Sequence, residues 1–458
     1  MEGQETAAQS IHRRNIAADG GIPRPRPEGS SYLGNFAADP IENVRVAIIG
    51  ISSRGVPVAG LFADIPHCTV VGLCDVQPEG VGQAADLFEQ KTGARPAEYT
   101  GSATAYLDML REQRPDAVFI HTCWETHADL AVDVMEHGAH AFVEVPLACS
   151  LEQLWRIVDT AERTRRHCMM LENVCYGREE LMFLNIVRQG LLGPLLHGEA
   201  AYIHDLRCQM LSEDPEKGAW RTYHFASRNG NLYPTHGLGP ISQYMSLARG
   251  EDTFDRLVSF SSPAIGRAAY ARRQFPADHP WNALEFQCGD INTAIIKTRL
   301  GRTILLQWDE TSPRPYDRRN LIQGTEGVLA GYPTRAAGEP FCPAPDCAAA
   351  NLSGQESYQW YQGKEAEEDL HARYEHPLFS RLGNTEARNN GMDIIMLNRI
   401  IECLHSGTPL DQNVYEGALW SAVGPLTEKS VHEGGAPQVF PDFTRGEWQH
   451  TAKLPIIP

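Results

Sequence analysis

The sequence predicts an α/β protein, with an N-terminal Rossmann doubly wound parallel sheet followed by an α+β domain that has a large open, mainly antiparallel sheet. Three observations support this. Apolar segments alternate with amphipathic ones from residue 44 to about 165, a glycine-bearing turn follows the first apolar segment, and period-two runs prevail beyond Leu195. We expect an extended or disordered arm over residues 1–40, a nucleotide-binding Rossmann domain over 41–165 and a substrate domain over 166–458.

The first expected strand is Val44 to Gly50, followed by a turn and a helix to about Ile65. Gly50 and Gly55 occupy the first and third positions of a G-x-G-x-x-G dinucleotide fingerprint, while Ser52 replaces the second glycine. A serine still leaves the helix N-terminus free to hold a phosphate, and Arg54 adds positive charge. Glycine in such turns is also common for purely steric reasons, so the motif alone is weak.

The second expected strand, Thr69 to Cys74, ends at Asp75. This carboxylate lies roughly 20 residues beyond the glycine turn, where an acidic side chain accepts hydrogen bonds from the adenosine ribose. No arginine follows it, so the sequence favours NAD over NADP.

The segment Ala117 to Pro146 is typical of a βαβ unit: an apolar strand, a polar loop, an amphipathic helix, a turn at Gly138 and a second strand. Ligands of open α/β sheets bind beyond the carboxyl ends of the strands. The residues expected beside a cofactor on this ground are Thr122, Trp124, His127, Glu144 and Val145.

Beyond Pro146 the alternation of strands and helices continues at first and is then replaced by a series of strands. We expect helices over 151–164 and 179–189 and a strand over 168–172, with Asn173 at its end. Period-two strands are expected over 196–202, 257–262, 293–298, 303–308 and 319–323. The segment 414–431 is expected to be helical and to pack back against the first domain.

The composition of the chain limits the kinds of molecule that it is expected to bind. The chain has 458 residues and a formal net charge of −18, which argues against nucleic acid or an anionic membrane surface and favours an uncharged or cationic small substrate. No membrane span is expected. An Arg13-Arg14 pair has no apolar run after it, so no export signal is expected and a cytoplasmic location is the default.

Aromatic, histidine and arginine residues are concentrated between Gly198 and Gly239, a glycine-rich and aperiodic segment that suits a sugar site. His236 is the favoured proton-transfer residue because Pro234 and Gly237 set its backbone, although a structural role is the commoner fate of a single histidine. No metal is expected, because the spacing of the other candidate ligands, His204, Asp205 and His224 together with His236, matches no ligand pattern. Asp205, Asp309 and Glu310 are glycosidase carboxylates by residue type only.

The cofactor half resembles the glucose-fructose oxidoreductase and inositol dehydrogenase superfamily, whose members usually carry Glu-Lys-Pro where this chain has Glu144-Val145-Pro146. From about Val44 to Arg445 the chain more closely resembles glycoside hydrolase family 109, the NAD-dependent α-N-acetylgalactosaminidases. The shared strings are MLENVCYGREE (170–180), AYIHDLR (201–207), RNGNLYPTHGLGP (228–240), TSPRPYDR (311–318), GMD (391–393), PLDQNVYEGALWS (409–421) and FPDFTRG (440–446).

This resemblance implies the site residues. NAD would contact Ser53, Arg54, Asp75, Trp124, Glu125, Thr126, His127, Glu144, Val145 and Asn173. The sugar would contact Tyr202, Arg221, Tyr233, Pro234, Thr235, His236 and Tyr316. His236 is the first choice as acid or base, with Tyr233 or Tyr316 as the second. Family members commonly begin with a twin-arginine export signal, which would imply a periplasmic or exported protein if the start of this sequence were processed.

The activity implied is hydrolysis of glycosides with terminal N-acetylgalactosamine, expected to be the α anomer, with retention. Tightly bound NAD would oxidise C3 of the sugar, elimination and addition would replace the aglycone by water, and the hydride would return. Two alternatives remain, a plain NAD-dependent sugar dehydrogenase and a non-catalytic sugar-binding protein. Superfamily members often pair through their open sheets, which implies a homodimer here.

Overall fold

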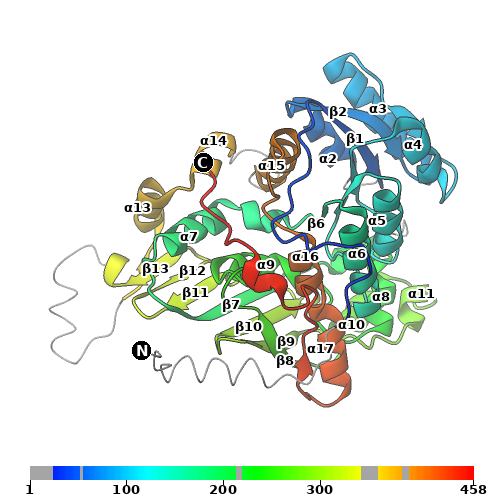
Figure 1. Ribbon diagram of the computed structural model, residues 1–458. Helices are drawn as coiled ribbons and strands as arrows, with labels where there is room; N and C mark the ends of the chain where they lie inside the picture. The colour runs from blue at the N-terminus through cyan, green and yellow to red at the C-terminus, as the bar shows by residue number, and fades with distance from the viewer. Residues whose placement is uncertain (1–23, 52–54, 213–218, 342–358, 384–390) are drawn as a thin grey trace, which may run out of the picture.

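A computed structural model of the chain describes residues 24–51, 55–212, 219–341, 359–383 and 391–458 (Figure 1). Two sheets dominate it, one parallel and one mixed, as the sequence predicts. Within these residues, none of the helices combines the length and the apolar character that crossing a membrane requires.

The first sheet is parallel and has the order β3-β2-β1-β4-β5-β6 over the described residues. This is the Rossmann strand order, which reverses direction between β1 and β4. Its strands are β1 (Val44–Ile49), β2 (Cys68–Cys74), β3 (Ala97–Tyr99), β4 (Ala117–Ile120), β5 (His140–Val143) and β6 (Cys168–Met170). Because β6 completes this sheet, the parallel layer extends past the boundary expected at residue 165.

Five helices connect these strands: α2 (Gly55–Leu61), α3 (Pro78–Thr92), α4 (Ala105–Gln113), α5 (His127–Glu136) and α6 (Leu151–Thr164). Local sequence explains several of their ends. Ser150 and Gln153 form a reciprocal capping box at the start of α6, and Pro78 occupies the first turn of α3, which Gly93 ends with φ of 76°.

The second sheet has the order β14-β13-β12-β11-β7-β10-β9-β8-β15 in the described part of the chain. Its strands are β7 (Leu195–Ile203), β8 (Phe254–Ser261), β9 (Asn292–Thr298), β10 (Thr303–Asp309), β11 (Leu321–Gly324), β12 (Gly327–Ala330), β13 (Arg335–Gly338), β14 (Tyr361–Gln362) and β15 (Gln438–Val439). The β7–β10 pair is parallel and the other pairs of neighbouring strands in this part of the chain are antiparallel, in agreement with the prediction of a mainly antiparallel sheet.

Helices of the second half cover one face of this sheet: α9 packs on β7, and α17 packs on β8. The described helices of the second half of the chain are α7 (Arg178–Arg188), α8 (Arg221–Ser227), α9 (Thr235–Tyr244), α10 (Gly266–Gln274), α11 (Pro280–Ala283), α13 (Lys364–Tyr374), α14 (Pro377–Leu382), α15 (Met392–Ser406), α16 (Val414–Ser421) and α17 (Val423–His432). Helix α16 contacts α6 and β6, so C-terminal segments join the two layers (Figure 1).

Two segments differ from expectation. The aperiodic stretch expected between Gly198 and Gly239 contains helix α8 and the start of α9, and the single helix expected over 414–431 is divided at Ala422. The arm over residues 24–40 has no helix or strand, yet it is anchored: Arg26 binds Glu162 at 3.0 Å, and Leu33 is buried. Residues 1–23 of the expected arm lie outside the described residues.

Candidate active site

A cavity of about 1090 Å³ lies between the carboxyl edge of the first sheet and the second half of the chain. Its walls come from the segments after β1, β2, β4 and β5 and from β7, α8 and α9. Pockets for one small molecule usually measure about 300–1000 Å³. The cavity is therefore large enough for two ligands side by side.

The glycine turn after β1 forms one end of the cavity. Gly50 has φ of 93°, and a Cβ atom there would lie 2.7 Å from the carbonyl oxygen of His121, so only glycine fits at this crossing of β1 and β4. Asp75 lies beside it, with its carboxylate accepting the backbone N–H groups of Ile51 at 2.6 Å and Gln77 at 2.9 Å. The expected cofactor contacts Ser53 and Arg54 lie outside the described residues.

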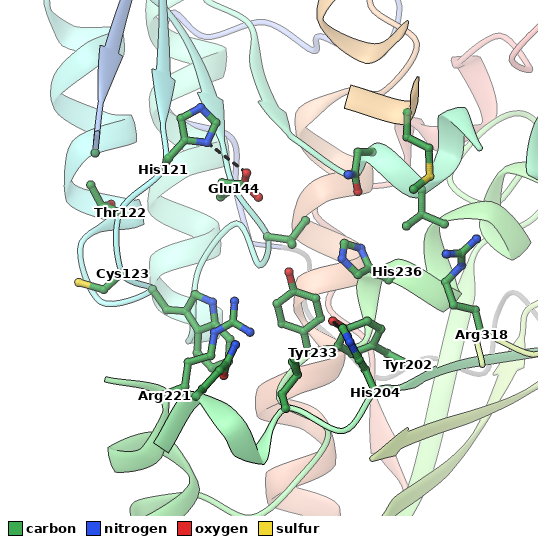
Figure 2. Close-up of a pocket in the computed structure, with 18 of the residues that line it drawn as sticks. His121, Thr122, Cys123, Glu144, Tyr202, His204, Arg221, Tyr233, His236 and Arg318 are labelled. Carbon is green, nitrogen blue, oxygen red and sulfur yellow. Dashed lines mark hydrogen bonds and ion pairs between the residues drawn. The ribbon is translucent and has the colours of Figure 1, made fainter. Parts of the chain in front are cut away.

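The loop after β4 and the end of β5 form the next part of the wall. Nδ1 of His121 lies 3.1 Å from a carboxylate oxygen of Glu144, and both residues line the cavity (Figure 2). Thr126 also lines it and donates a hydrogen bond to Thr122 at 2.7 Å. Val145 also lines the cavity, to which it brings an apolar side chain.

Two expected cofactor residues, Glu125 and His127, do not line the cavity. His127 has no exposed surface, and its ring nitrogens lie 2.8 Å from the carbonyl oxygen of Pro146 and 3.1 Å from that of Thr122. Burial lowers the pKa of His127, although these carbonyl oxygens oppose the shift. Glu125 forms an ion pair with His224 at 2.9 Å, and this contact lowers the pKa of Glu125 to about 2. His127 and Glu125 therefore affect the cavity only by fixing the loop after β4.

The end of β6 supplies a carboxylate that the sequence analysis did not single out. Glu172 is fully buried, and one of its oxygens lies 2.7 Å from Nδ1 of His236. The His236 side chain is 15% exposed and lines the cavity. Because Nδ1 is engaged by Glu172, Nε2 is the nitrogen left for a ligand. Asn173, the next residue along the chain, lines the cavity and donates a hydrogen bond to Asp393 at 2.8 Å.

Aromatic rings surround His236. The ring centroids of Tyr202 and Tyr233 lie 5.1 Å and 4.9 Å from its imidazole, and all three side chains face the same space (Figure 2). The Tyr202 hydroxyl lies 2.9 Å from Nδ1 of His204. Burial raises the pKa of both tyrosines far above the ordinary value, so each carries its phenolic proton at neutral pH.

Arg221, at the start of α8, is enclosed by three rings. Its guanidinium carbon lies 5.2 Å from the ring centroid of Trp124, 5.3 Å from that of Trp220 and 5.2 Å from that of Tyr233. Aromatic faces stabilise a cation and keep its planar fork in one orientation. Arg221 lines the cavity, so the fork can bind an oxygen of a ligand there.

Tyr316 belongs to a second hydrogen-bonded group. Arg318 donates from Nη1 to the Tyr316 hydroxyl at 2.8 Å and from Nη2 to Glu180 at 2.6 Å. Tyr316 is 38% exposed, and its ring lies edge-on to His204 at 5.0 Å. The site therefore contains a tyrosine whose oxygen accepts a hydrogen bond from a buried arginine.

The remaining expected residues have other partners. Pro234 and Thr235 are buried at the start of α9 and orient His236 through the backbone. Asp205 binds Arg207 at 2.7 Å, Asp309 accepts the N–H groups of Thr311 and Ser312, and Glu310 accepts a hydrogen bond from Trp308 at 3.3 Å. The three carboxylates considered by residue type are thus engaged elsewhere in the fold.

Sequence reasoning missed His121, Glu172 and Arg318, which line or support the cavity. A signal existed for two of them: His121 immediately follows β4, and Glu172 follows β6, at the carboxyl edge where ligands bind. Arg318 had no such signal, because its role depends on contacts with Glu180 and Tyr316.

Two family models cover the chain. Residues 44–172 match an oxidoreductase family with an NAD-binding Rossmann fold, and residues 176–450 match the C-terminal domain of glycosyl hydrolase 109. A glycosyl hydrolase family 109 protein of Akkermansia muciniphila is 56% identical over 94% of this chain and 88% of its own length. Another, from Shewanella pealeana, is 48% identical over 95% and 93%.

Solved structures share the fold at low identity. A levoglucosan dehydrogenase in complex with NADH and levoglucosan has a TM-score of 0.63 and 15% identity, covering 87% of this chain and all (100%) of its own. An inositol dehydrogenase homologue from Azotobacter vinelandii, complexed with NAD⁺, has a TM-score of 0.62 and 15% identity over 89% and 99%. Because residues 44–172 match a family with an NAD-binding Rossmann fold, the first domain binds NAD. Gly50 and Asp75 line the cavity, where a glycine turn and a carboxylate at the end of the second strand fit the requirements of a dinucleotide.

Proposed function

The chain belongs to glycosyl hydrolase family 109, and from this premise we propose that it hydrolyses terminal α-N-acetylgalactosaminides, with retention, by oxidation, elimination, addition and reduction around bound NAD. One observation carries the proposal. His236, oriented by buried Glu172, opens onto the cavity that Asp75 and Val145 also line. The proton-transfer group His236 therefore faces the same cavity as the carboxyl edge of the first sheet, where the cofactor would lie.

The residues available for the cofactor follow the carboxyl edge of the first sheet. They are Gly50, Asp75, Thr122, Trp124, Thr126, Glu144, Val145 and Asn173. When bound, NAD would accept a hydride from C3 of the sugar and return it at the end of the cycle. The remaining work is proton transfer, because a ketone at C3 makes the proton at C2 acidic enough for a side chain to remove.

His236 is suited to remove that proton. With its Nδ1 hydrogen donated to Glu172, Nε2 carries a lone pair toward the cavity, and the buried carboxylate stabilises the positive charge that forms on the ring. Tyr202 and Tyr233 keep their protons and serve as hydrogen-bond donors to sugar oxygens. Tyr316, held by Arg318, is the second candidate for the base.

Loss of the C2 proton expels the aglycone from C1 and leaves a conjugated enone, to which water adds. Negative charge develops on the C3 oxygen as the proton leaves. Arg221 is a fixed cation of the same cavity and can stabilise this oxygen or bind the acetamido carbonyl. The cycle returns the cofactor to its starting state.

Direct displacement would need an acid and a nucleophile or base, usually two carboxylates facing the anomeric carbon. The carboxylates in the described cavity wall are already assigned: Asp75 to backbone N–H groups, Glu144 to His121 and Glu180 to Arg318. The other two carboxylates, Glu179 in the first turn of α7 and Glu367 on α13, lie together beside His371. This distribution supports the redox route.

A sugar dehydrogenase is the second candidate, favoured by the fold shared with levoglucosan dehydrogenase. Val145 weakens it, because valine cannot supply the proton donor that lysine provides in the related dehydrogenases. The two functions differ in products: a dehydrogenase accumulates NADH and an oxidised sugar, whereas the proposed cycle accumulates neither.

The test is incubation of the purified protein with p-nitrophenyl α-N-acetylgalactosaminide in deuterated water. Release of nitrophenol with deuterium at C2 of the sugar, and without net NADH, supports the proposal. Nitrophenol release without deuterium at C2 indicates direct displacement. Absence of release, together with NADH formation from free sugars, indicates the dehydrogenase.

A further inference from the structure

Three side chains with metal-binding groups meet where α13 packs on α7. Helices α7 and α13 lie next to each other (Figure 1). Glu179 lies in the first turn of α7, and Glu367 and His371 lie one turn apart on α13. One ligand atom from each lies within 4.8 Å of the others. The sequence could not indicate this group, because Glu179 is distant from the other two along the chain.

The imidazole of His371 makes no hydrogen bond in the described part of the chain. The His371 side chain is 7% exposed, and neither ring nitrogen has a hydrogen-bond partner there. Nε2 lies 3.6 Å from a carboxylate oxygen of Glu179. That distance is too long for a hydrogen bond, but two ligands bonded to one tetrahedral zinc at about 2.0–2.2 Å are separated by about 3.4 Å.

Charge at the cluster also favours a cation. Glu179, Glu367 and Glu375 bring three carboxylates together, and Arg178 neutralises Glu375 through a hydrogen bond at 2.8 Å. These negative surroundings stabilise a metal ion bonded to His371.

We propose that Glu179, Glu367 and His371 bind a divalent metal ion of the zinc class that clamps α13 to α7. Nitrogen and carboxylate ligands suit zinc, and three protein ligands leave one coordination position open. Glu179 and Glu367 line the large cavity, so the open position faces it and can take water or a hydroxyl oxygen of a ligand. The site does not depend on the proposed glycosidase activity.

The test is zinc binding by the full chain after removal of metals with a chelator, in the presence of a non-thiol reductant. Wild type, Glu367→Gln, His371→Ala and Glu368→Gln are compared by calorimetry. Glu368 is the matched control, because it lies on the same helix and is exposed, near Lys364. We expect one equivalent of zinc in wild type and in the control, and at least tenfold weaker binding in the other two variants.

Two further readouts keep the proposal testable if His371→Ala unfolds. Cobalt(II) should give the visible absorption of a tetrahedral site in wild type but not in Glu367→Gln, which preserves the size of the side chain. Zinc should raise the melting temperature of wild type and not that of Glu367→Gln. Equal zinc binding by all four proteins would assign the metal to cysteine thiols and overturn the proposal, as would the absence of binding by wild type.

Discussion

Glu172 and His236, 64 residues apart in the sequence, form a hydrogen bond of 2.7 Å at the edge of the cavity. The carboxylate is completely buried, whereas the imidazole reaches the cavity. A buried anion that holds Nδ1 fixes both the tautomer and the direction of the ring. Glu172 is thus a positioning residue for His236.

Glu172→Gln should lower kcat by at least about 10²-fold, because the amide no longer stabilises the positive imidazole formed during proton transfer. Bound NAD and the KM should remain close to wild type, since Glu172 is shielded from the cavity by His236. Steady-state kinetics and the NAD content of the purified protein measure these effects. Glu428→Gln is the control, because Glu428 binds Arg228 outside the cavity wall. Equal losses in both variants would reduce Glu172 to a structural role.

Asp75→Asn should weaken NAD binding by about 10- to 100-fold, the range expected when a charged hydrogen bond is lost. The asparagine amide can still meet one of the backbone N–H groups of Ile51 and Gln77, so the turn should persist. Calorimetric titration with NAD measures the change. Asp64→Asn is the matched control, because Asp64 pairs with Lys91 on the surface. Unchanged affinity in Asp75→Asn would remove Asp75 from the cofactor site.

Much of the first sheet could be predicted because its signals are local. The expected strand over residues 44–50 and helix over 151–164 correspond to β1 and α6, since a continuous apolar run marks a doubly buried strand and Ser150 with Gln153 marks a helix start. Once the strands are identified, their carboxyl ends indicate the edge of the sheet at which ligands bind. For this reason Asp75, Glu144 and Val145 were identified from sequence and lie in the cavity wall.

Helix α9 was missed for a physical reason. Its sequence contains Gly237, Gly239 and Pro240, which local propensity assigns to loops. In the fold, a Cβ atom on Gly237 would lie 2.4 Å from the backbone nitrogen of Ala201, and one on Gly239 would lie 2.9 Å from Cγ of Glu172. These glycines let α9 approach β7 and the segment after β6 closely, and that approach brings His236 to Glu172. Tertiary packing overrode propensity at the residues that build the site.

Arg221→Lys should raise the KM for the glycoside by about 5- to 100-fold, because lysine keeps the charge but loses the planar fork that stacks between the rings of Trp124 and Tyr233. NAD binding should not change, since the proposed role of Arg221 is toward the sugar. Initial rates across substrate concentration, with NAD titration, separate the two effects. Arg207→Lys is the control, because Arg207 pairs with Asp205 and does not line the cavity. A similar KM in both variants would argue against sugar recognition by Arg221.

His376 provides a prediction about acid stability. It is completely buried at the start of α14, where its Nδ1 accepts the backbone N–H of Leu378 at 3.1 Å. Burial lowers its pKa to about 4, partly opposed by Asp411 and Glu375. The unfolded chain therefore takes up this proton first as the pH falls. Stability should decrease from about pH 6.5 down to about pH 4, by on the order of 3 kcal/mol from this residue.

His376→Asn should remove this contribution while keeping the cap, because the asparagine side-chain oxygen can accept the same N–H group without titrating. Urea unfolding at pH 7 and at pH 4.5 measures the difference in the free energy of unfolding between the two conditions. That difference should be smaller in the variant by on the order of 2 kcal/mol. Burial also lowers the pKa of His140 and His167, and these residues act equally in both proteins. An identical loss of stability in variant and wild type would show that His376 does not drive acid unfolding.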